Sequence, residues 1–172
     1  MKYYAGIGSR DCPNDVLEVM TKIGTYLAKK GFILRSGGTD GCDKAFENGC
    51  DLVNGEKEIY LPWCGFNGSN SNLVVSDEKA FEIAEIYHPY WNNLKQGARK
   101  LQARNSHQIL GKDLNTPSEF IVCYTKGGKC IGGTAQALRI AKDKYVPVFN
   151  FGCYKDIEEG KKEFLEFIKR FV

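Results

Sequence analysis

Three glycine-rich segments carry hydroxyl, guanidinium and carboxyl side chains, which are groups that can bind phosphate or move a proton. They are Gly6-Ile7-Gly8-Ser9-Arg10, Ser36-Gly37-Gly38-Thr39-Asp40-Gly41-Cys42-Asp43 and Gly132-Gly133-Thr134. Backbone N–H groups left open by glycine at the start of a helix form an anion site, which the helix dipole strengthens. The alternative is that the glycines only permit tight turns, because a single G-x-G is a weak motif. Three such segments favour a phosphate-containing ligand.

Charged side chains near these glycines extend the predicted site. Arg10 and Arg104 can pair with phosphate through two parallel hydrogen bonds, or they can be ordinary surface charges. Asp43 can contact ribose hydroxyls or act as a base, or it can balance the dipole of the helix that it begins. The hydroxyl groups in the segments can donate to phosphate or cap helices. The predicted phosphate-binding residues are Gly8, Ser9, Arg10, Ser36, Gly37, Gly38, Asp40, Gly132, Gly133 and Thr134.

Strands and helices must alternate along the chain to position these segments. Short apolar runs predict strands over residues 2–5, 32–34, 58–61, 120–124 and 146–149, and helical spacing of apolar residues predicts helices between them. Such alternation requires right-handed crossovers and gives a parallel sheet between helices. We therefore predict a single Rossmann-like α/β domain over residues 1–172, with about five parallel strands. In this fold, ligands bind beyond the carboxyl ends of the strands.

Composition excludes several other classes of protein. The chain has 172 residues, of which 42% are hydrophobic and 26% charged, as in globular domains and unlike disordered or collagen-like chains. The net charge of +3 is too small to indicate a nucleic-acid partner on charge alone. No apolar run approaches the roughly 18 residues of a membrane helix, and the first residues lack the apolar stretch of a signal peptide. We expect a cytoplasmic protein with no membrane partner.

Cysteine spacing and motif content indicate neither a metal nor a cofactor. The seven cysteines form no C-x-x-C pair and no Cys/His cluster, so we expect reduced thiols and no metal site. Cys42, at the start of a predicted helix, is either a reactive thiol or a buried structural one. Neither the G-x-G-x-x-G dinucleotide fingerprint nor the Walker sequence occurs, and we expect no cofactor.

The order of the motifs resembles that of a known superfamily. The first two glycine segments resemble the N-terminal motifs of the Rossmann-like domain in the DNA-processing protein A family. The later motifs are similar to those of the LONELY GUY phosphoribohydrolases, formerly called lysine decarboxylase-like proteins. They are Arg104-Asn105, Ser118-Glu119-Phe120-Ile121-Val122 and Gly132-Gly133-Thr134-Ala135-Gln136. Both families belong to the SLOG superfamily of proteins that bind nucleotides and nucleotide-derived ligands, and the resemblance spans residues 3–150.

The resemblance implies a nucleoside 5′-monophosphate ligand and an activity that hydrolyses the N-glycosidic bond. Arg104 matches the catalytic arginine of the phosphoribohydrolases, but Gln136 occupies the position of their glutamate. A neutral amide stabilises an oxocarbenium-like transition state poorly, so another carboxylate must replace the glutamate if the chain is an enzyme. Asp40 and Asp43 are the candidates, and the predicted catalytic set is Arg104, Gln136 and Asp43.

Other functions remain open from the sequence. The chain could be a sensor or sequestering protein for a nucleotide signal, without catalysis, or a scaffold whose site has decayed. It could also be a module that binds single-stranded DNA like DNA-processing protein A, using basic residues between Lys95 and Arg104. The DNA hypothesis predicts an affinity that falls steeply with salt. The resemblance further implies a homo-oligomer.

Overall fold

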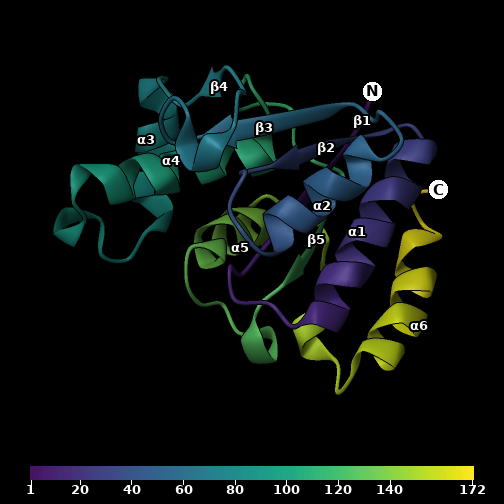
Figure 1. Cartoon of the computed structure of the whole chain (residues 1–172). Helices are drawn as coiled ribbons and strands as arrows, with labels where there is room; N and C mark the ends of the chain where they lie inside the picture. The colour runs from purple at the N-terminus through teal and green to yellow at the C-terminus, as the bar shows by residue number, and fades with distance from the viewer.

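The chain contains six short strands and six helices, and the computed structural model describes all 172 residues (Figure 1). The strands are β1 (Lys2–Gly8), β2 (Phe32–Ser36), β3 (Lys57–Leu61), β4 (Leu73–Val74), β5 (Phe120–Tyr124) and β6 (Val148–Asn150). The helices are α1 (Asn14–Lys29), α2 (Cys42–Asp51), α3 (Glu78–Tyr87), α4 (Gln96–Leu110), α5 (Thr134–Asp143) and α6 (Ile157–Ile168). None of these helices has the length and apolar character needed to cross a membrane.

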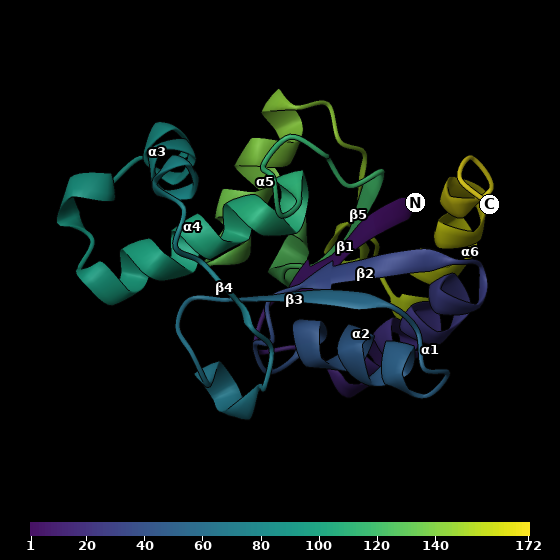
Figure 2. The same cartoon turned by 90° about the horizontal axis from the view of Figure 1, so that it is seen from above.

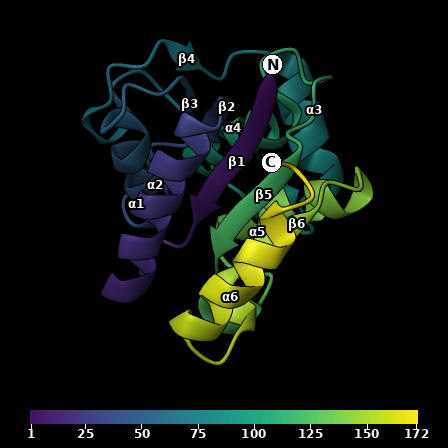
Figure 3. The ribbon, with the colours of Figure 1, turned by 90° about the vertical axis from the view of Figure 1, so that its right-hand side faces the viewer.

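All strands are parallel and form one sheet in the order β4-β3-β2-β1-β5-β6. β1 pairs with β2 on one side and β5 on the other, so that Tyr4 lies opposite both Leu34 and Phe120 (Figure 3). The strand order reverses at β1, which makes the crevice beside its carboxyl end the usual ligand site of such a sheet. The fold is therefore Rossmann-like, as predicted.

The sheet has six strands rather than about five. The additional strand, β4, is only two residues long and pairs with Tyr60 and Leu61 at the edge of the sheet. Two residues carry no alternating pattern, and they follow a stretch of glycine, asparagine and serine that is typical of a loop. The strand depends on its neighbour β3 rather than on its own sequence.

Two helical layers cover the two faces of the sheet (Figure 2). Helices α1, α2 and α6 enclose one apolar cluster, and α3, α4 and α5 enclose the other. The central strands supply both clusters in alternation: Phe120 and Val122 face the first, while Ile121 and Cys123 face the second. Because β5 is buried on both faces, its sequence is one continuous apolar run.

Helices α1 and α2 pack closely because each has a glycine at their contact. A Cβ atom on Gly24 would lie 2.5 Å from the carbonyl oxygen of Phe46, and one on Gly49 would overlap the carbonyl oxygen of Thr21. Thr25 Oγ1 donates a hydrogen bond to the Gly49 carbonyl across the same contact, at 2.8 Å. This contact fixes α2, whose first turn carries Asp43, against the rest of the fold.

A buried arginine fixes the connection between α4 and β5. Arg35 is 2% exposed, pairs with Glu58 at 3.0 Å and donates to the carbonyl oxygen of Thr116 at 2.6 Å. Its guanidinium also stacks on the ring of Tyr3, 3.8 Å from the ring centre. These partners satisfy a charge that would otherwise be costly to bury.

The helix contact leads to a test with a matched control. Gly49→Ala should lower the free energy of unfolding by about 1–3 kcal/mol. The cost of forcing a methyl group against the Thr21 backbone exceeds what alanine gains over glycine in helix propensity. Gly97→Ala should be neutral or stabilising, because a Cβ on this helical glycine has no neighbour nearer than 3.9 Å. Urea unfolding of both variants checks this, and equal effects would contradict the close contact.

Candidate functional site

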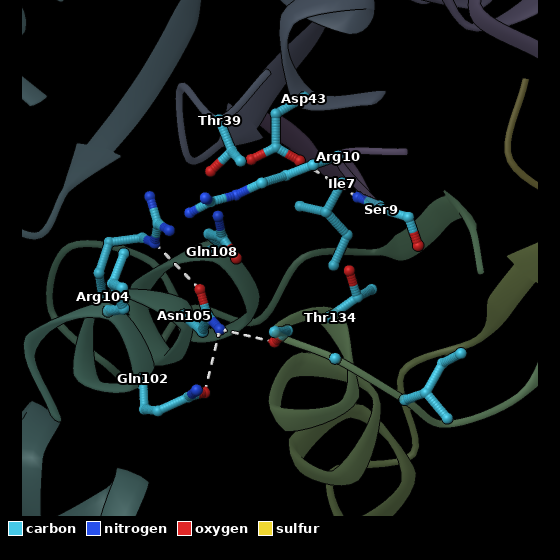
Figure 4. A pocket seen from close by; sticks show the side chains of 15 residues that line it. Ile7, Ser9, Arg10, Thr39, Asp43, Gln102, Arg104, Asn105, Gln108 and Thr134 are labelled. Carbon is cyan, nitrogen blue, oxygen red and sulfur yellow. Dashed lines mark hydrogen bonds between the residues drawn. The ribbon is translucent and has the colours of Figure 1, made fainter. Parts of the chain in front are cut away.

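A pocket of about 420 Å³ opens beyond the carboxyl ends of the central strands (Figure 4). Its walls come from the turn after β1, the start of α2, one face of α4 and the start of α5. The lining residues are Ile7, Gly8, Ser9, Arg10, Thr39, Asp43, Leu101, Gln102, Arg104, Asn105, Gln108, Ile131, Gly132, Gly133 and Thr134. Only three of them are hydrophobic, so the pocket suits a polar ligand.

Asp43 joins the first two glycine turns. Its Oδ1 accepts from the N–H of Gly8 at 3.1 Å, and its Oδ2 accepts from the N–H of Gly37 at 3.2 Å. The turns also touch directly at Gly41, whose φ of +86° is left-handed and whose missing side chain leaves room for the carbonyl oxygen of Ser9. Both turns are therefore held in one fixed arrangement.

Burial changes the acidity of this carboxyl group. Desolvation raises the pKa of Asp43 to about 6, although the Arg104 charge and the backbone N–H groups of Thr39, Gly8 and Gly37 act to lower it. The group is largely ionised at neutral pH, with one backbone N–H on each oxygen. It is the only carboxylate that lines the pocket.

Arg104 is buried behind the pocket rather than extended into solvent. Its Nη1 donates to the carbonyl oxygens of Gly37 and Tyr60, the latter at 3.1 Å, and its Nε donates to Asn105 Oδ1 at 3.0 Å. Burial lowers the pKa of Arg104 to about 10; Asp43 opposes this, and the nearby Arg10 charge lowers it further. The guanidinium remains charged at neutral pH, and its Nη2 makes no hydrogen bond within the chain.

Arg10 approaches Arg104 from the opposite wall. Its exposed side chain makes no hydrogen bond or ion pair within the chain, and Figure 4 shows it extended across the pocket between Asp43 and Gln108. Two positive charges that face one pocket repel each other unless an anion lies between them. Two arginines against the single carboxylate of Asp43 leave the lining with a net positive charge, which suits an anion.

The turn before α5 forms the remaining wall. Gly132 has a left-handed φ of +64°, and a Cβ on either Gly132 or Gly133 would meet no atom within 4 Å. The N–H groups of Gly132, Gly133 and Thr134 donate to no acceptor in the chain. Asn105 Nδ2 donates to the carbonyl oxygen of Gly133 at 3.0 Å and holds this turn against α4. Three free N–H groups at a helix N-terminus are the usual backbone anion site.

Gln108 is a lining residue that the sequence analysis missed. It is 3% exposed, and its amide group makes no hydrogen bond within the chain although it faces the pocket (Figure 4). A Cβ on Gly37 would overlap its Nε2, so the amide packs directly against the second glycine turn. The spacing of Arg104, Asn105 and Gln108 places them on one helical face, and this polar stripe was the available signal.

Several predicted site residues lie outside the pocket lining. Ser36 is buried and donates its hydroxyl to the Gly6 carbonyl at 2.6 Å, while Gly37 and Gly38 lie behind the pocket wall. Asp40 is exposed and accepts from Asn67 at 2.9 Å. The remaining predicted residues, namely Gly8, Ser9, Arg10, Asp43, Arg104, Gly132, Gly133 and Thr134, are brought together.

Gln136 also points away from the pocket. It is fully buried, its Nε2 donates to the Ala84 carbonyl at 2.9 Å, and its Oε1 accepts from Arg139 at 2.8 Å. As the third residue of α5, its side chain turns toward α3. Its amide therefore has a packing role between helices, and it does not reach the pocket that Arg104 and Asp43 line.

Comparison with known proteins identifies structures of similar fold. No protein-family model matches the sequence, and no relative is found among curated proteins. DNA processing protein A from Helicobacter pylori, studied for its single-stranded DNA binding mode, aligns with a TM-score of 0.59 and 20% identity, over 96% of this chain and 72% of that one. Two structures of the molybdenum cofactor carrier protein from Chlamydomonas reinhardtii align over 100% of this chain and 88% of theirs, with TM-scores of 0.53 and 0.56 and identities of 18% and 16%. The chain shares their Rossmann-like fold.

The raised pKa of Asp43 predicts a pH-dependent stability. The folded chain holds the Asp43 proton up to about pH 6, whereas the ordinary pKa of an aspartic acid side chain is 3.8. Asp43 therefore contributes fully to stability below about pH 4, and this contribution is lost as the pH rises through 6. The stability difference between wild type and Asp43→Asn, which cannot titrate, should shrink by on the order of 2 kcal/mol from pH 4 to pH 7. Urea unfolding at a series of pH values measures it, and a difference that grows with pH would contradict the assignment.

Proposed function

We propose that the pocket binds a nucleoside phosphate or a nucleotide-derived ligand, with its phosphate on the turn before α5. The observation that carries the proposal is a pocket lined by Arg10 and Arg104, with Asp43 as its single carboxylate, together with three free N–H groups on the turn before α5. A phosphate would separate the two positive charges and accept from the Gly132–Thr134 backbone. The predicted phosphate-binding roles of Ser9, Arg10 and Thr134 are part of this proposal.

The rest of the pocket supports a ligand larger than a free phosphate ion. Its volume of about 420 Å³ lies in the range of small-molecule sites. The Gln108 amide offers one donor and one acceptor side by side, which is the pattern that a nucleobase edge pairs with. A ligand with phosphate at one end and such a polar edge at the other would satisfy both walls.

Fold and motif order together support placing the chain in the SLOG superfamily. The three glycine turns follow β1, β2 and β5 of a Rossmann-like sheet, where the resemblance requires them. The fold is shared with DNA processing protein A and with a molybdenum cofactor carrier, and the latter's cargo is a small molecule. These likenesses support a binding function for this chain.

Binding without hydrolysis fits the geometry better than a phosphoribohydrolase. Gln136, at the position of the family glutamate, is turned toward α3, and Asp40 faces Asn67. Asp43 is the remaining carboxylate, and each of its oxygens already accepts a backbone N–H. A group committed to holding two turns is poorly placed to stabilise an oxocarbenium-like charge or to activate water. We therefore favour a sensor, carrier or sequestering protein.

Single-stranded DNA is the second candidate, favoured by the likeness to DNA processing protein A. The segment from Lys95 to Arg104 does not form a continuous basic surface, because Arg104 is buried and Arg99 packs over Trp91 with its guanidinium 5.2 Å from the ring centre. Lys95 and Lys100 remain available from that segment. This arrangement favours a free nucleotide over a polynucleotide.

One experiment separates these functions. The purified protein is incubated with a pool of nucleoside 5′-monophosphates, and mass spectrometry measures the nucleotide retained after gel filtration together with any released base and ribose 5-phosphate. We expect retention without release. Release of base would instead support a hydrolase, for which Asp43 is the one carboxylate in the pocket lining. Absence of retention, with an oligonucleotide bound in a steeply salt-dependent manner, would support the DNA-binding alternative.

The anion turn can be blocked without disturbing the fold. Gly133 has φ of −64° and open space at its Cβ position, so Gly133→Leu should leave the melting temperature unchanged. The added side chain should occupy the phosphate position and reduce affinity by roughly tenfold or more, which is a loss of about 1.4 kcal/mol. Gly97→Leu, on the exposed start of α4, is the control. Calorimetric titration measures both, and intact affinity in Gly133→Leu would contradict the site placement.

Gln108 provides a test that separates binding from stability. Its buried amide has no partner in the chain, so Gln108→Met, which keeps the volume, should leave stability unchanged or raised. Affinity for the retained nucleotide should fall by about tenfold, because a hydrogen-bond partner of the ligand is lost. Gln96→Met, at the exposed first residue of α4, is the control. A destabilised Gln108→Met with normal affinity would show that the amide has a structural role.

A further inference from the structure

Two cysteines from separate segments meet beside the first glycine turn. The sulfur atoms of Cys12 and Cys42 are 3.0 Å apart, and the Cys42 thiol donates a hydrogen bond to Cys12. Cys12 lies in the connection from β1 to α1, and Cys42 is the first residue of α2. No other pair among the seven cysteines makes a sulfur–sulfur contact of this kind. The fold therefore brings together one specific pair of thiols.

The two thiols differ in exposure. Cys12 is partly exposed to solvent, whereas Cys42 is fully buried. The hydrogen bond to Cys12 and burial both raise the pKa of the Cys42 thiol, which therefore stays protonated. Of the two, only Cys12 is open to a reagent.

The pair directly adjoins the first glycine turn and the Asp43 clamp. A Cβ on Gly8 would lie 2.8 Å from the Cys42 sulfur, and the N–H of Cys42 donates to the carbonyl oxygen of Ser9 at 3.3 Å. Asp43, which holds the N–H of Gly8, follows Cys42 in the sequence. A covalent bond between the two sulfurs would tie the segment that carries Ser9 and Arg10 to the start of α2.

We propose that Cys12 and Cys42 form a modification site at which a hydroperoxide produces a reversible intrachain disulfide. The Cys12 sulfur attacks a peroxide oxygen, the O–O bond breaks, and sulfenic acid forms on Cys12 with release of water or an alcohol. The Cys42 sulfur then attacks the Cys12 sulfur, and the hydroxyl group leaves as water with the Cys42 proton. Two thiols lose two electrons in total, and the peroxide gains them.

The geometry requires little movement for this step. The sulfurs must approach by about 1 Å to reach the S–S bond length of roughly 2.05 Å. The resulting loop encloses α1 and β2, since the two cysteines are 30 positions apart. Closing a loop of this size restricts the unfolded chain and should raise the melting temperature of the oxidised protein.

The test is peptide mapping after mild oxidation of the native chain with hydrogen peroxide. Trypsin releases Cys12 in residues 11–22 and Cys42 in residues 36–44, and neither peptide contains another cysteine. We expect these two peptides to be linked, with the loss of two hydrogen atoms from the intact mass. Dithiothreitol should reverse the link, and the oxidised protein should melt at a higher temperature than the reduced one.

Cysteine variants distinguish the pair from the exposed thiols. Cys12→Ser removes the partly exposed partner and should abolish the link, whereas Cys64→Ser, at an exposed cysteine elsewhere, should leave it intact. Because Cys12→Ser leaves the buried Cys42 in place, the test does not depend on a core substitution. The proposal would be overturned if the peptides of Cys12 and Cys42 stayed unlinked under conditions that oxidise the exposed Cys64, Cys130 and Cys153. A link that forms equally fast in urea, where the fold no longer brings the thiols together, would also overturn it.

Discussion

The carboxylate of Asp43 is the interaction on which the site depends. It accepts one backbone N–H from each of the first two glycine turns, and these turns end neighbouring strands of the sheet. Arg104 compensates its charge and extends the connection, since it donates to the Gly37 carbonyl and to Asn105. Asn105 in turn holds the Gly133 carbonyl. One buried network therefore links all three glycine turns, and low local polarity strengthens each of its hydrogen bonds.

The network arranges the pocket for an anion before any ligand arrives. Arg104 is already desolvated and oriented by three acceptors, and the Gly132–Thr134 backbone is fixed with its N–H groups open. A ligand therefore loses little affinity to reorganisation of these walls. The mobile contribution is that of Arg10, whose exposed side chain has no partner in the chain. Rigid backbone donors and one mobile arginine suit a site that recognises the phosphate of a ligand and tolerates differences in the group attached to it.

Fold class was predictable because it depends on apolar periodicity, which is local. The fully buried β5 and the glycine turns were identified for that reason, whereas β4 was missed because pairing with β3 alone defines it. The roles of individual polar side chains depend on tertiary packing. Gln136 stands at a motif position but turns toward α3, while Gln108 belongs to no motif and lines the pocket. Arg35 illustrates the same limit, because nothing in its local sequence indicates that Glu58 and a distant loop bury it.

The central position of β1 has a consequence for how the chain folds. β1 is the first strand to leave the ribosome among the six, yet it lies between β2 and β5, and its β5 partners begin at Phe120. One edge of β1 must therefore stay unpaired until more than two thirds of the 172 residues have been synthesised. Pairing between strands so far apart in sequence slows folding and prolongs the exposure of an apolar strand edge. During synthesis, the same strand that later positions the pocket therefore depends on protection from aggregation.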